Sequence, residues 1–361
     1  MPVPLFDNRA LAATDADVRA KVAAVLDKGV YVLGEEVRAF EAEFAAHLGV
    51  AHAVGVANGT DAIVLALRAL GVGAGDDVVV PSFTFYASAE AIALTGARPV
   101  FCDVDPQTYC VTEDSVRAAL TPATKAVLVV HLFGNVAPVA EIEALGVPVV
   151  EDAAQAAGST GERGRPGALG TLATFSFYPS KNLPAFGDGG AVTTRDTDLA
   201  ERLRMLRFHG SRDKRTFELV GHNSRLDELQ AGILRVLLPH LDAWSDGRRA
   251  AARAYAAAGL GELVALPEPT PGSSPAWHLY VVRHERADAL LESLNAAGIG
   301  ARAYYRVPVH AQPAMREFAP AVQLPGTEEA ARTNLAIPMS PVLGPPEAAE
   351  VVAAMRVPAL A

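Results

Sequence analysis

The sequence contains little lysine and little cysteine. Five of the 361 residues are lysine and 26 are arginine, so this chain normally uses arginine where a plain cation is needed. Two cysteines, Cys102 and Cys110, are too few for a disulfide framework or a cysteine-rich metal centre. They fit a reducing cytoplasm, where we expect the protein to reside, and we expect no metal site.

The charge and hydropathy patterns exclude two kinds of partner. The formal net charge is −10 and the chain has no basic tail or stripe, which argues against binding to nucleic acid. No stretch reaches about 18 uninterrupted apolar residues, so we expect no membrane-spanning helix and no membrane partner. The first residues show no basic region followed by an apolar segment, so we expect no secretory signal.

The centre of the chain alternates between short apolar runs and amphipathic segments, which is typical of a mostly parallel sheet covered by helices. The runs predicted as strands are residues 53–56, 78–81, 99–104, 126–131, 147–151, 173–177 and 191–194. The segments predicted as helices are residues 61–70, 86–94, 113–120 and 139–145.

Further helices are predicted on both sides of this centre. Residues 10–48 form two helices that separate near residues 31–34, and residues 226–241 form one long amphipathic helix that bridges two domains. A smaller α/β unit follows. Its predicted elements are a strand at residues 276–282, a helix at 287–297, a strand that opens at 298–300, and a helix at 347–355.

Lys181 stands in a predicted loop between two strands, after the aromatic residues 175–178 and before the glycine-rich residues 187–190. Such a loop can desolvate the amine, which lowers its pKa and lets it form a Schiff base. The alternative is an ordinary solvated lysine. The shortage of lysine favours the first interpretation, because arginine cannot form a Schiff base at neutral pH.

Asp152 follows the apolar, β-branched residues 147–150, which are typical of a central parallel strand. It therefore lies at the carboxyl end of that strand, where open α/β sheets bind their ligands. A carboxylate there can keep a pyridine nitrogen protonated, and pyridoxal phosphate enzymes combine such a carboxylate with a Schiff-base lysine. The alternative is a helix N-cap before Ala153.

Seven short motifs follow one another along the chain. They are residues 57–62 (ANGTDA), 81–85 (PSFTF), 151–155 (EDAAQ), 176–183 (SFYPSKNL), 187–190 (GDGG), 223–227 (NSRLD) and 310–313 (HAQP). In this order and spacing, from about residue 30 to the C-terminus, the chain resembles the DegT/DnrJ/EryC1/StrS family of pyridoxal phosphate enzymes, the nucleotide-sugar aminotransferases.

The resemblance implies the α/β fold of the fold-type I aminotransferases. A seven-stranded, mostly parallel sheet would form a large domain at residues 1–240, and a smaller α/β domain would occupy residues 241–361. The implied cofactor is pyridoxal 5′-phosphate, with pyridoxamine 5′-phosphate as its intermediate form. Lys181 would be the catalytic lysine, Asp152 the partner of the ring nitrogen, and Gln155 a neighbour of the ring hydroxyl.

The cofactor phosphate needs hydrogen-bond donors. Gly59 and Thr60 follow a strand and open a helix, so their N–H groups and the helix dipole face an anion. The alternative is a helix capped by Thr60 without a ligand. The resemblance adds Ser176 as a phosphate contact, and Phe85 as a ring stacked on the cofactor unless it is a core residue. The resemblance also implies that Asn223 contacts the phosphate from a neighbouring subunit, and therefore that the protein is a homodimer with shared active sites.

The substrate side is predicted from a basic cluster and a motif near the C-terminus. Residues 207–215 would attract a diphosphate, unless they are a solvated charged run. The family usually has His-Tyr-Pro where this chain has Tyr-Tyr-Arg at 304–306, and usually has glycine at the position of Pro184. The residues predicted to contact substrate are His209, Arg212, Tyr305, Arg306 and His310.

The resemblance implies a two-step transamination from L-glutamate to a nucleotide-linked keto-sugar. We expect a thymidine diphosphate (TDP) 4-keto-6-deoxyhexose or its 3-keto isomer, converted to a TDP-amino sugar for natural-product biosynthesis. Three alternatives remain open: a cyclitol aminotransferase, a sugar dehydratase that uses the same cofactor, and a non-catalytic regulator. Dehydratases of the family carry histidine in place of Lys181, and a regulator is expected to lose Lys181 or Asp152.

Overall fold

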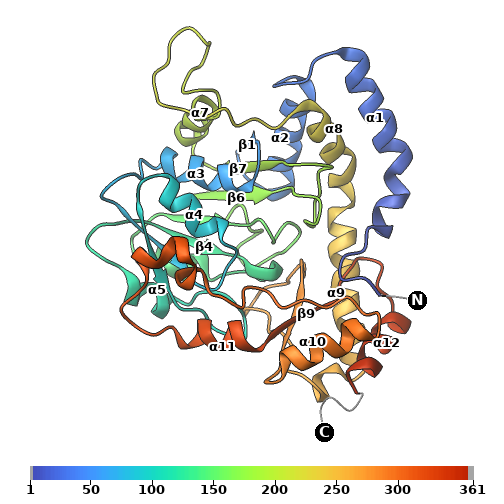
Figure 1. Ribbon diagram of the computed structural model, residues 1–361. Helices are drawn as coiled ribbons and strands as arrows, with labels where there is room; N and C mark the ends of the chain where they lie inside the picture. The colour runs from blue at the N-terminus through green and yellow to red at the C-terminus, as the bar shows by residue number, and fades with distance from the viewer. Residues whose placement is uncertain (1–2, 357–361) are drawn as a thin grey trace.

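A seven-stranded sheet forms the centre of the protein, whose computed structural model describes residues 3–356 (Figure 1). The strands are β1 (His52–Val56), β2 (Asp77–Pro81), β3 (Arg98–Cys102), β4 (Thr124–Val130), β5 (Val149–Asp152), β6 (Leu172–Ser176) and β7 (Gly190–Thr194). Their order across the sheet is β1-β7-β6-β5-β4-β2-β3. Strand β7 is antiparallel to both of its neighbours and every other pair is parallel, which confirms the mostly parallel sheet.

The parallel strands β4, β5 and β6 bring their carboxyl ends to one edge of the sheet. Val130 and Asp152 are register partners in β4 and β5, and Asp152 and Thr174 are partners in β5 and β6. Strand β6 ends two residues later at Ser176, and the chain then loops back into antiparallel β7. This edge therefore collects the ends of three buried strands together with the loop that carries Lys181.

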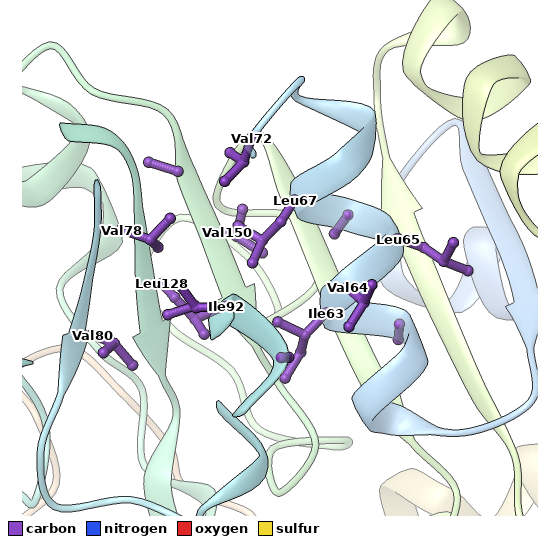
Figure 2. Packing of buried hydrophobic residues seen from close by; sticks show 14 of the residues in the cluster. Ile63, Val64, Leu65, Leu67, Val72, Val78, Val80, Ile92, Leu128 and Val150 are labelled. Atoms are coloured by element: carbon purple, nitrogen blue, oxygen red, sulfur yellow. The ribbon is translucent and has the colours of Figure 1, made fainter. Parts of the chain in front are cut away.

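One face of the sheet is covered by α3 (Gly59–Ala69), α4 (Ala87–Leu94) and α7 (Thr197–Leu206). Helices α3 and α4 lie within two residues of their predicted bounds. Figure 2 shows Ile63 and Leu67 of α3 and Ile92 of α4 packed over Leu128 and Val150 of the strands. All five side chains are buried, and burial of each contributes about 1.5–3 kcal/mol to stability. Two shorter helices, α5 (Glu113–Ala119) and α6 (Val139–Glu143), follow β3 and β4.

Two N-terminal helices and α8 cover part of the opposite face (Figure 1). Helices α1 (Asp15–Lys28) and α2 (Glu35–Leu48) are separated where the sequence predicts, and both pack against α8 (Glu228–Leu237). Phe40 and Phe44 of α2 contact Phe175 and Phe177, with the Phe44 and Phe175 ring centroids 4.9 Å apart. The aromatic side chains that precede the Lys181 loop thereby fix the loop to the core.

The long helix predicted at residues 226–241 is wrong in both bounds. Helix α8 starts at Glu228, because Asp227 is its N-cap and accepts a 2.8 Å hydrogen bond from the N–H of Gln230. A 3-10 turn at Leu238–His240 contains Pro239, and α9 then runs over Leu241–Ala257. The alanine and arginine residues of α9 obscure its apolar face in the sequence. Helix α9 extends from the sheet to the C-terminal elements (Figure 1).

The C-terminal part contains a two-stranded antiparallel sheet of β8 (Tyr280–Arg283) and β9 (Asn334–Ile337). Its helices are α10 (Ala287–Ala296), α11 (Pro325–Thr333) and α12 (Pro345–Met355). The strand predicted to open at residue 298 is wrong, because Ile299 and Arg302 form only isolated bridges. Strand β9 and helix α11 were missed. The division at residues 240 and 241 stays a prediction.

Within residues 3–356, no helix combines the length and apolar character that a membrane crossing requires.

Candidate active site

A cavity of about 1190 Å³ opens at the carboxyl edge of β4, β5 and β6. Its walls come from these strand ends, from the first turns of α3 and α4, from the Lys181 loop and from residues 302–312. The predicted residues that line it are Gly59, Thr60, Phe85, Asp152, Gln155, Ser176, Lys181, Tyr305 and Arg306. The structure thus brings together residues that the sequence separates by up to 247 positions.

Asp152 is a buried carboxylate at the end of β5. Its Oδ2 accepts a 2.8 Å hydrogen bond from the hydroxyl of Ser88, and its Oδ1 accepts a 3.1 Å bond from the N–H of Ala154. Burial raises the pKa of Asp152, while these two hydrogen bonds and the nearby charge of Lys181 oppose the rise. The helix N-cap alternative is wrong, because turns and no helix follow Asp152.

Lys181 lies in a loop fixed by backbone hydrogen bonds. Its N–H donates to the carbonyl of Tyr178 at 2.8 Å, and the N–H of Ala185 donates to the carbonyl of Phe177 at 2.6 Å. Burial lowers the pKa of Lys181 to about 8, and the charge of Asp152 opposes the shift. Lys181 and Asp152 therefore face one cavity and influence each other electrostatically. The amine is partly neutral near pH 8 and can act as a nucleophile or a base.

The start of α3 forms a cradle for an anion. Asn58, rather than Thr60, is the helix N-cap, and its side chain accepts a 2.8 Å hydrogen bond from the N–H of Asp61. No hydrogen bond joins the N–H groups of Gly59 or Thr60 to another residue of the described part of the chain. A Cβ at Gly59 would lie 2.7 Å from the Cβ of Ser176, so only glycine permits this close approach. Two N–H groups and one hydroxyl therefore face the cavity together.

Phe85 presents its ring to the cavity, whereas Phe83 belongs to the core. Phe85 is 58% exposed and Phe83 is 0% exposed, so the alternative that Phe85 is a core residue is wrong. Gln155 lies behind this region, where its Oε1 accepts a 2.7 Å bond from the N–H of Phe133 and its Nε2 donates to the hydroxyl of Tyr305 at 3.3 Å. Gln155 therefore fixes the orientation of the Tyr305 hydroxyl.

A histidine that was not predicted from the sequence, His278, shares the cavity with Lys181. His278 is buried, lines the cavity, and places its Nδ1 3.3 Å from Oδ1 of Asn182. The amide nitrogen of Asn182 donates to the carbonyls of Ala157 and Ala276, so its oxygen must accept the Nδ1 proton of His278. Burial and the charge of Lys181 hold the pKa of His278 well below its usual value. His278 is therefore neutral, with its Nε2 as an acceptor.

Arg306 lines the cavity, but its guanidinium is occupied elsewhere. It donates to the carboxylate of Asp288 at 2.6 Å and to the carbonyls of Ala331 and Arg332 at 2.7 and 3.0 Å. Its side chain thus joins α10 to the end of α11. The cavity contains a second arginine that the sequence analysis missed, Arg302, which has no such partner among the ion pairs of residues 3–356.

His310 lies outside the cavity lining. Its Nδ1 is 2.5 Å from the hydroxyl of Ser82, and its ring centroid is 6.1 Å from that of Phe101. The side chain therefore contacts the end of β2 and the edge strand β3 rather than the space above Lys181. Its predicted contact with substrate has no support in the geometry of this chain.

His209, Arg212 and Asn223 also lie outside the cavity lining, in the segment 207–224 that projects above α7 (Figure 1). All three residues are exposed, so within one chain they contribute nothing to the site around Lys181. Arg212 lies 3.4 Å from a carboxylate oxygen of Glu201 and 3.5 Å from one of Glu218, which partly neutralises the basic cluster.

Arg207, at the base of the projecting segment, is buried against the sheet. It pairs with Glu41 at 2.5 Å and donates to the carbonyl of Gly55 at 2.7 Å. Arg207 therefore stabilises the fold and offers no charge to a ligand. Among residues 3–356, no group of three or more His, Cys, Asp and Glu side chains is arranged to hold a metal ion.

Comparison with known proteins decides among the chemistries that this site allows. A family model described as the DegT/DnrJ/EryC1/StrS aminotransferase family matches residues 12–356. The chain belongs to this family. The resemblance stated from the motifs is thereby confirmed, and this aminotransferase uses pyridoxal phosphate as its relatives do.

Two curated relatives match this aminotransferase over almost its whole length. It is 49% identical to a dTDP-3-amino-3,4,6-trideoxy-alpha-D-glucose transaminase of Streptomyces venezuelae, over 98% of this chain and 95% of that protein. It is 44% identical to a UDP-N-acetyl-3-dehydro-alpha-D-glucosamine 3-aminotransferase of Acidithiobacillus ferrooxidans, over 98% and 97%. The solved structure of DesV from S. venezuelae, in complex with a ketimine intermediate, superposes with a TM-score of 0.96 at 47% identity, covering 100% of this chain and 99% of that one.

The donor set of the cavity fits the cofactor of this aminotransferase. Lys181 can bond to the aldehyde carbon, and Asp152 can pair with the ring nitrogen. The cradle of Gly59, Thr60 and Ser176 offers three donors to a phosphate, all within the same lining. The aromatic face of Phe85 is available for stacking.

Proposed function

We propose that this enzyme transfers the amino group of L-glutamate to a nucleotide-linked keto-sugar, a TDP-linked 3-keto-6-deoxyhexose, to give the 3-amino sugar. The observation that carries the proposal is the pairing of Lys181 and Asp152 in one cavity of about 1190 Å³. That volume exceeds the usual range for a drug-sized ligand and far exceeds the need of an amino acid alone. The 3-amino and 3-dehydro sugars in the names of two relatives support C3 over C4.

Asp152 and Lys181 have different roles in the proposed reaction. Pyridoxal phosphate, when bound, supplies a protonated ring that accepts the electron pair released at the substrate carbon. Asp152 holds the proton on the ring nitrogen. Lys181 would move a proton at the substrate carbon, and a pKa of about 8 suits a group that must both take and give it.

The remaining residues of the site position the ligands. Gly59, Thr60 and Ser176 bind the phosphate through their N–H and hydroxyl groups, and Phe85 covers one face of the ring and excludes water from it. Gln155 orients the hydroxyl of Tyr305 toward the ring side of the cavity. Their roles follow from the donors and faces that line the cavity.

A homodimer is part of the proposal. The segment 207–224 leaves the sheet with Phe217 and Val220 exposed at 60% and 85%, and a second copy of the chain would cover them. In a dimer this segment would bring Asn223 to the phosphate of a second copy, together with His209 and Arg212. Light scattering at micromolar concentration tests the dimer, and Asn223→Ala should then weaken cofactor binding about tenfold. We expect the enzyme in the cytoplasm.

A cyclitol ketone is the alternative acceptor, because the residues around Lys181 would serve it equally well. The dehydratase and the regulator proposed from the sequence are set aside, since the chain is an aminotransferase with Lys181 and Asp152 in one cavity.

The decisive experiment presents the pyridoxamine form of the enzyme with a panel of nucleotide keto-sugars and cyclitol ketones and identifies each product by NMR. We expect turnover with a nucleotide 3-keto-sugar and glutamate, and none with Lys181→Ala. The matched control is Lys125→Ala, which removes an exposed lysine of β4 away from the cavity. Borohydride should fix the cofactor onto Lys181 in the wild type. Turnover by Lys181→Ala, or reaction with a cyclitol ketone alone, contradicts the proposal.

A further inference from the structure

Arg302 lines the cavity from a backbone position that is fixed by two hydrogen bonds. Its N–H donates to the carbonyl of Ala336 at 3.1 Å, and its own carbonyl accepts the N–H of Ala336 at 2.8 Å. Ala336 belongs to β9, so the residue is anchored to the C-terminal sheet. The guanidinium carbon lies 5.4 Å from the centroid of the Tyr304 ring. The charge of Arg302 also opposes the burial that raises the pKa of Tyr304, so the guanidinium interacts with that hydroxyl as well. The other N–H groups of the planar guanidinium are available to a ligand.

Among the charged residues that line the cavity, Arg302 is the one that attracts an anion approaching from outside. Asp61, Glu90 and Asp188 also line the cavity, so much of its wall repels an anion. Arg306 is committed to Asp288 and to two backbone carbonyls. No ion pair within residues 3–356 includes Arg302.

Arg302 is an exposed residue of the cavity wall, whereas Asp152 is buried at the end of β5. A carboxylate on the carbon that carries the amine would lie within a few bonds of Lys181. An oxyanion beyond a sugar ring lies farther out, where Arg302 is exposed.

We propose that Arg302 is a specificity-determining residue that binds the diphosphate of the nucleotide-sugar acceptor. A guanidinium presents two parallel N–H donors that match adjacent phosphate oxygens, which a lysine cannot do. The assignment rests on the proposed function, because it names the part of the acceptor that this residue recognises. The sequence predicted residues 207–215 for the diphosphate and Arg306 as a substrate contact, and Arg302 adds a diphosphate contact supplied by the same chain.

The test compares the two half-reactions of the holoenzyme in Arg302→Gln. The pyridoxamine form is mixed rapidly with the nucleotide 3-keto-sugar, and the pyridoxal form with glutamate, each over a range of concentrations. We expect the apparent Kd for the keto-sugar to rise about tenfold or more, which is the value of a hydrogen bond to a charged group. The limiting rate and the glutamate half-reaction should change by less than about threefold. Arg302→Lys should recover only part of the affinity.

Arg316→Gln is the matched control, because it removes the same charge from an exposed residue that does not line the cavity. Thermal unfolding of each variant checks that the fold is retained. An unchanged Kd for the keto-sugar in Arg302→Gln overturns the proposal. An equal loss with glutamate also overturns it, because the effect would then not depend on the diphosphate.

Titration of TDP, measured without turnover, separates this inference from the proposed function. Weaker binding of TDP to Arg302→Gln supports the role of Arg302 even if no keto-sugar reacts, in which case the proposed function alone fails. Reaction of the keto-sugar with equal Kd in both proteins leaves the proposed function intact and rejects the role of Arg302. Failure of TDP to bind the wild type also rejects it.

Discussion

The inner end of the cavity and its mouth are built in different ways. The inner end is formed by residues at the ends of adjacent strands, Asp152 and Ser176, and by the loop of Lys181. The mouth is formed by residues 302–312, which lie between short helical turns and isolated bridges. At the inner end, short motifs at the junctions of strands and loops determine which side chains face the cavity. At the mouth, distant partners decide which side chains are available to a ligand.

At the mouth, the local sequence does not show which arginine is available to a ligand, as Arg302 and Arg306 illustrate. Both are arginines of one short segment and both line the cavity. Arg306 is held by Asp288, which lies 18 residues earlier in α10. Arg302 is held through its backbone by Ala336 of β9, and its guanidinium lies against the ring of Tyr304 without an ion pair within residues 3–356. Four variants test this contrast, three at or next to the inner end and one at the mouth.

Asp152→Asn should have the largest effect. The amide keeps the size of the side chain but cannot hold a proton on the ring nitrogen, so kcat should fall about 10²- to 10⁴-fold. Steady-state kinetics with saturating cofactor measures the loss. A decrease of less than about tenfold would show that the carboxylate is not the essential partner of the ring.

Glu151→Gln should affect stability rather than chemistry, although it is adjacent to Asp152. The buried Glu151 carboxylate accepts hydrogen bonds from His131 at 2.8 Å and from the N–H groups of Gly167, Leu169 and Gly170 at 3.0, 2.9 and 2.8 Å. A glutamine would turn its NH₂ group toward some of these four donors, and the loss of their hydrogen bonds to a buried carboxylate should lower the free energy of unfolding by about 2–5 kcal/mol. Urea denaturation measures the change.

The control for this variant is Glu141→Gln, an exposed residue of α6 that should change stability by no more than about 0.5 kcal/mol. Equal effects of the two substitutions would contradict the role assigned to Glu151.

The pH dependence of apoenzyme stability should report the burial of Lys181. Its pKa in the folded protein is about 8, below the usual value near 10.4, so between these values the unfolded chain binds more protons than the folded one. The free energy of unfolding should therefore rise with pH over that window, relative to Lys181→Met. Denaturation at several values between about pH 7 and about pH 10 measures the difference. Parallel curves for the two proteins would show that the amine is not desolvated.

Arg306→Gln should have the smallest effect. The partner of Arg306, Asp288, is exposed, so loss of the pair should cost no more than about 1 kcal/mol of stability. The Kd for the nucleotide keto-sugar should change less than in Arg302→Gln. If Arg306→Gln weakens acceptor binding more than Arg302→Gln does, the contrast between the two arginines is wrong.

Much of the large domain could be predicted, because its signals are local. The seven strands are short runs of valine and alanine bounded by polar residues, and each was placed within two residues of its observed ends. Lys181 and Asp152 stand at fixed offsets from two of these runs. The predicted helix ended at residue 241, where α9 begins, because the interior of α9 is alanine and arginine, and β9 was missed because four residues carry little periodicity.

The site residues that were not predicted, Ser88 and His278, were missed for the same physical reason. Ser88 contacts Asp152 across 64 positions, and His278 contacts Asn182 across 96. Neither contact leaves a pattern in its own segment, since a serine at a helix start and a histidine beside a strand are ordinary residues. Only the close approach of the folded chain shows that one supports a carboxylate and the other faces a lysine.

The register between β5 and β6 has a consequence for the tolerance of this chain to insertions. Asp152 is paired with Thr174 on adjacent parallel strands, so the spacing of the sheet, about 4.8 Å per strand, fixes the carboxylate relative to the start of the next loop. Only residues 177–180 separate the end of β6 from Lys181. One extra residue there would leave every strand in place and move the amine away from its carboxylate. The strand spacing therefore fixes the position of the carboxylate, and the length of this short loop sets the distance between the two reactive groups.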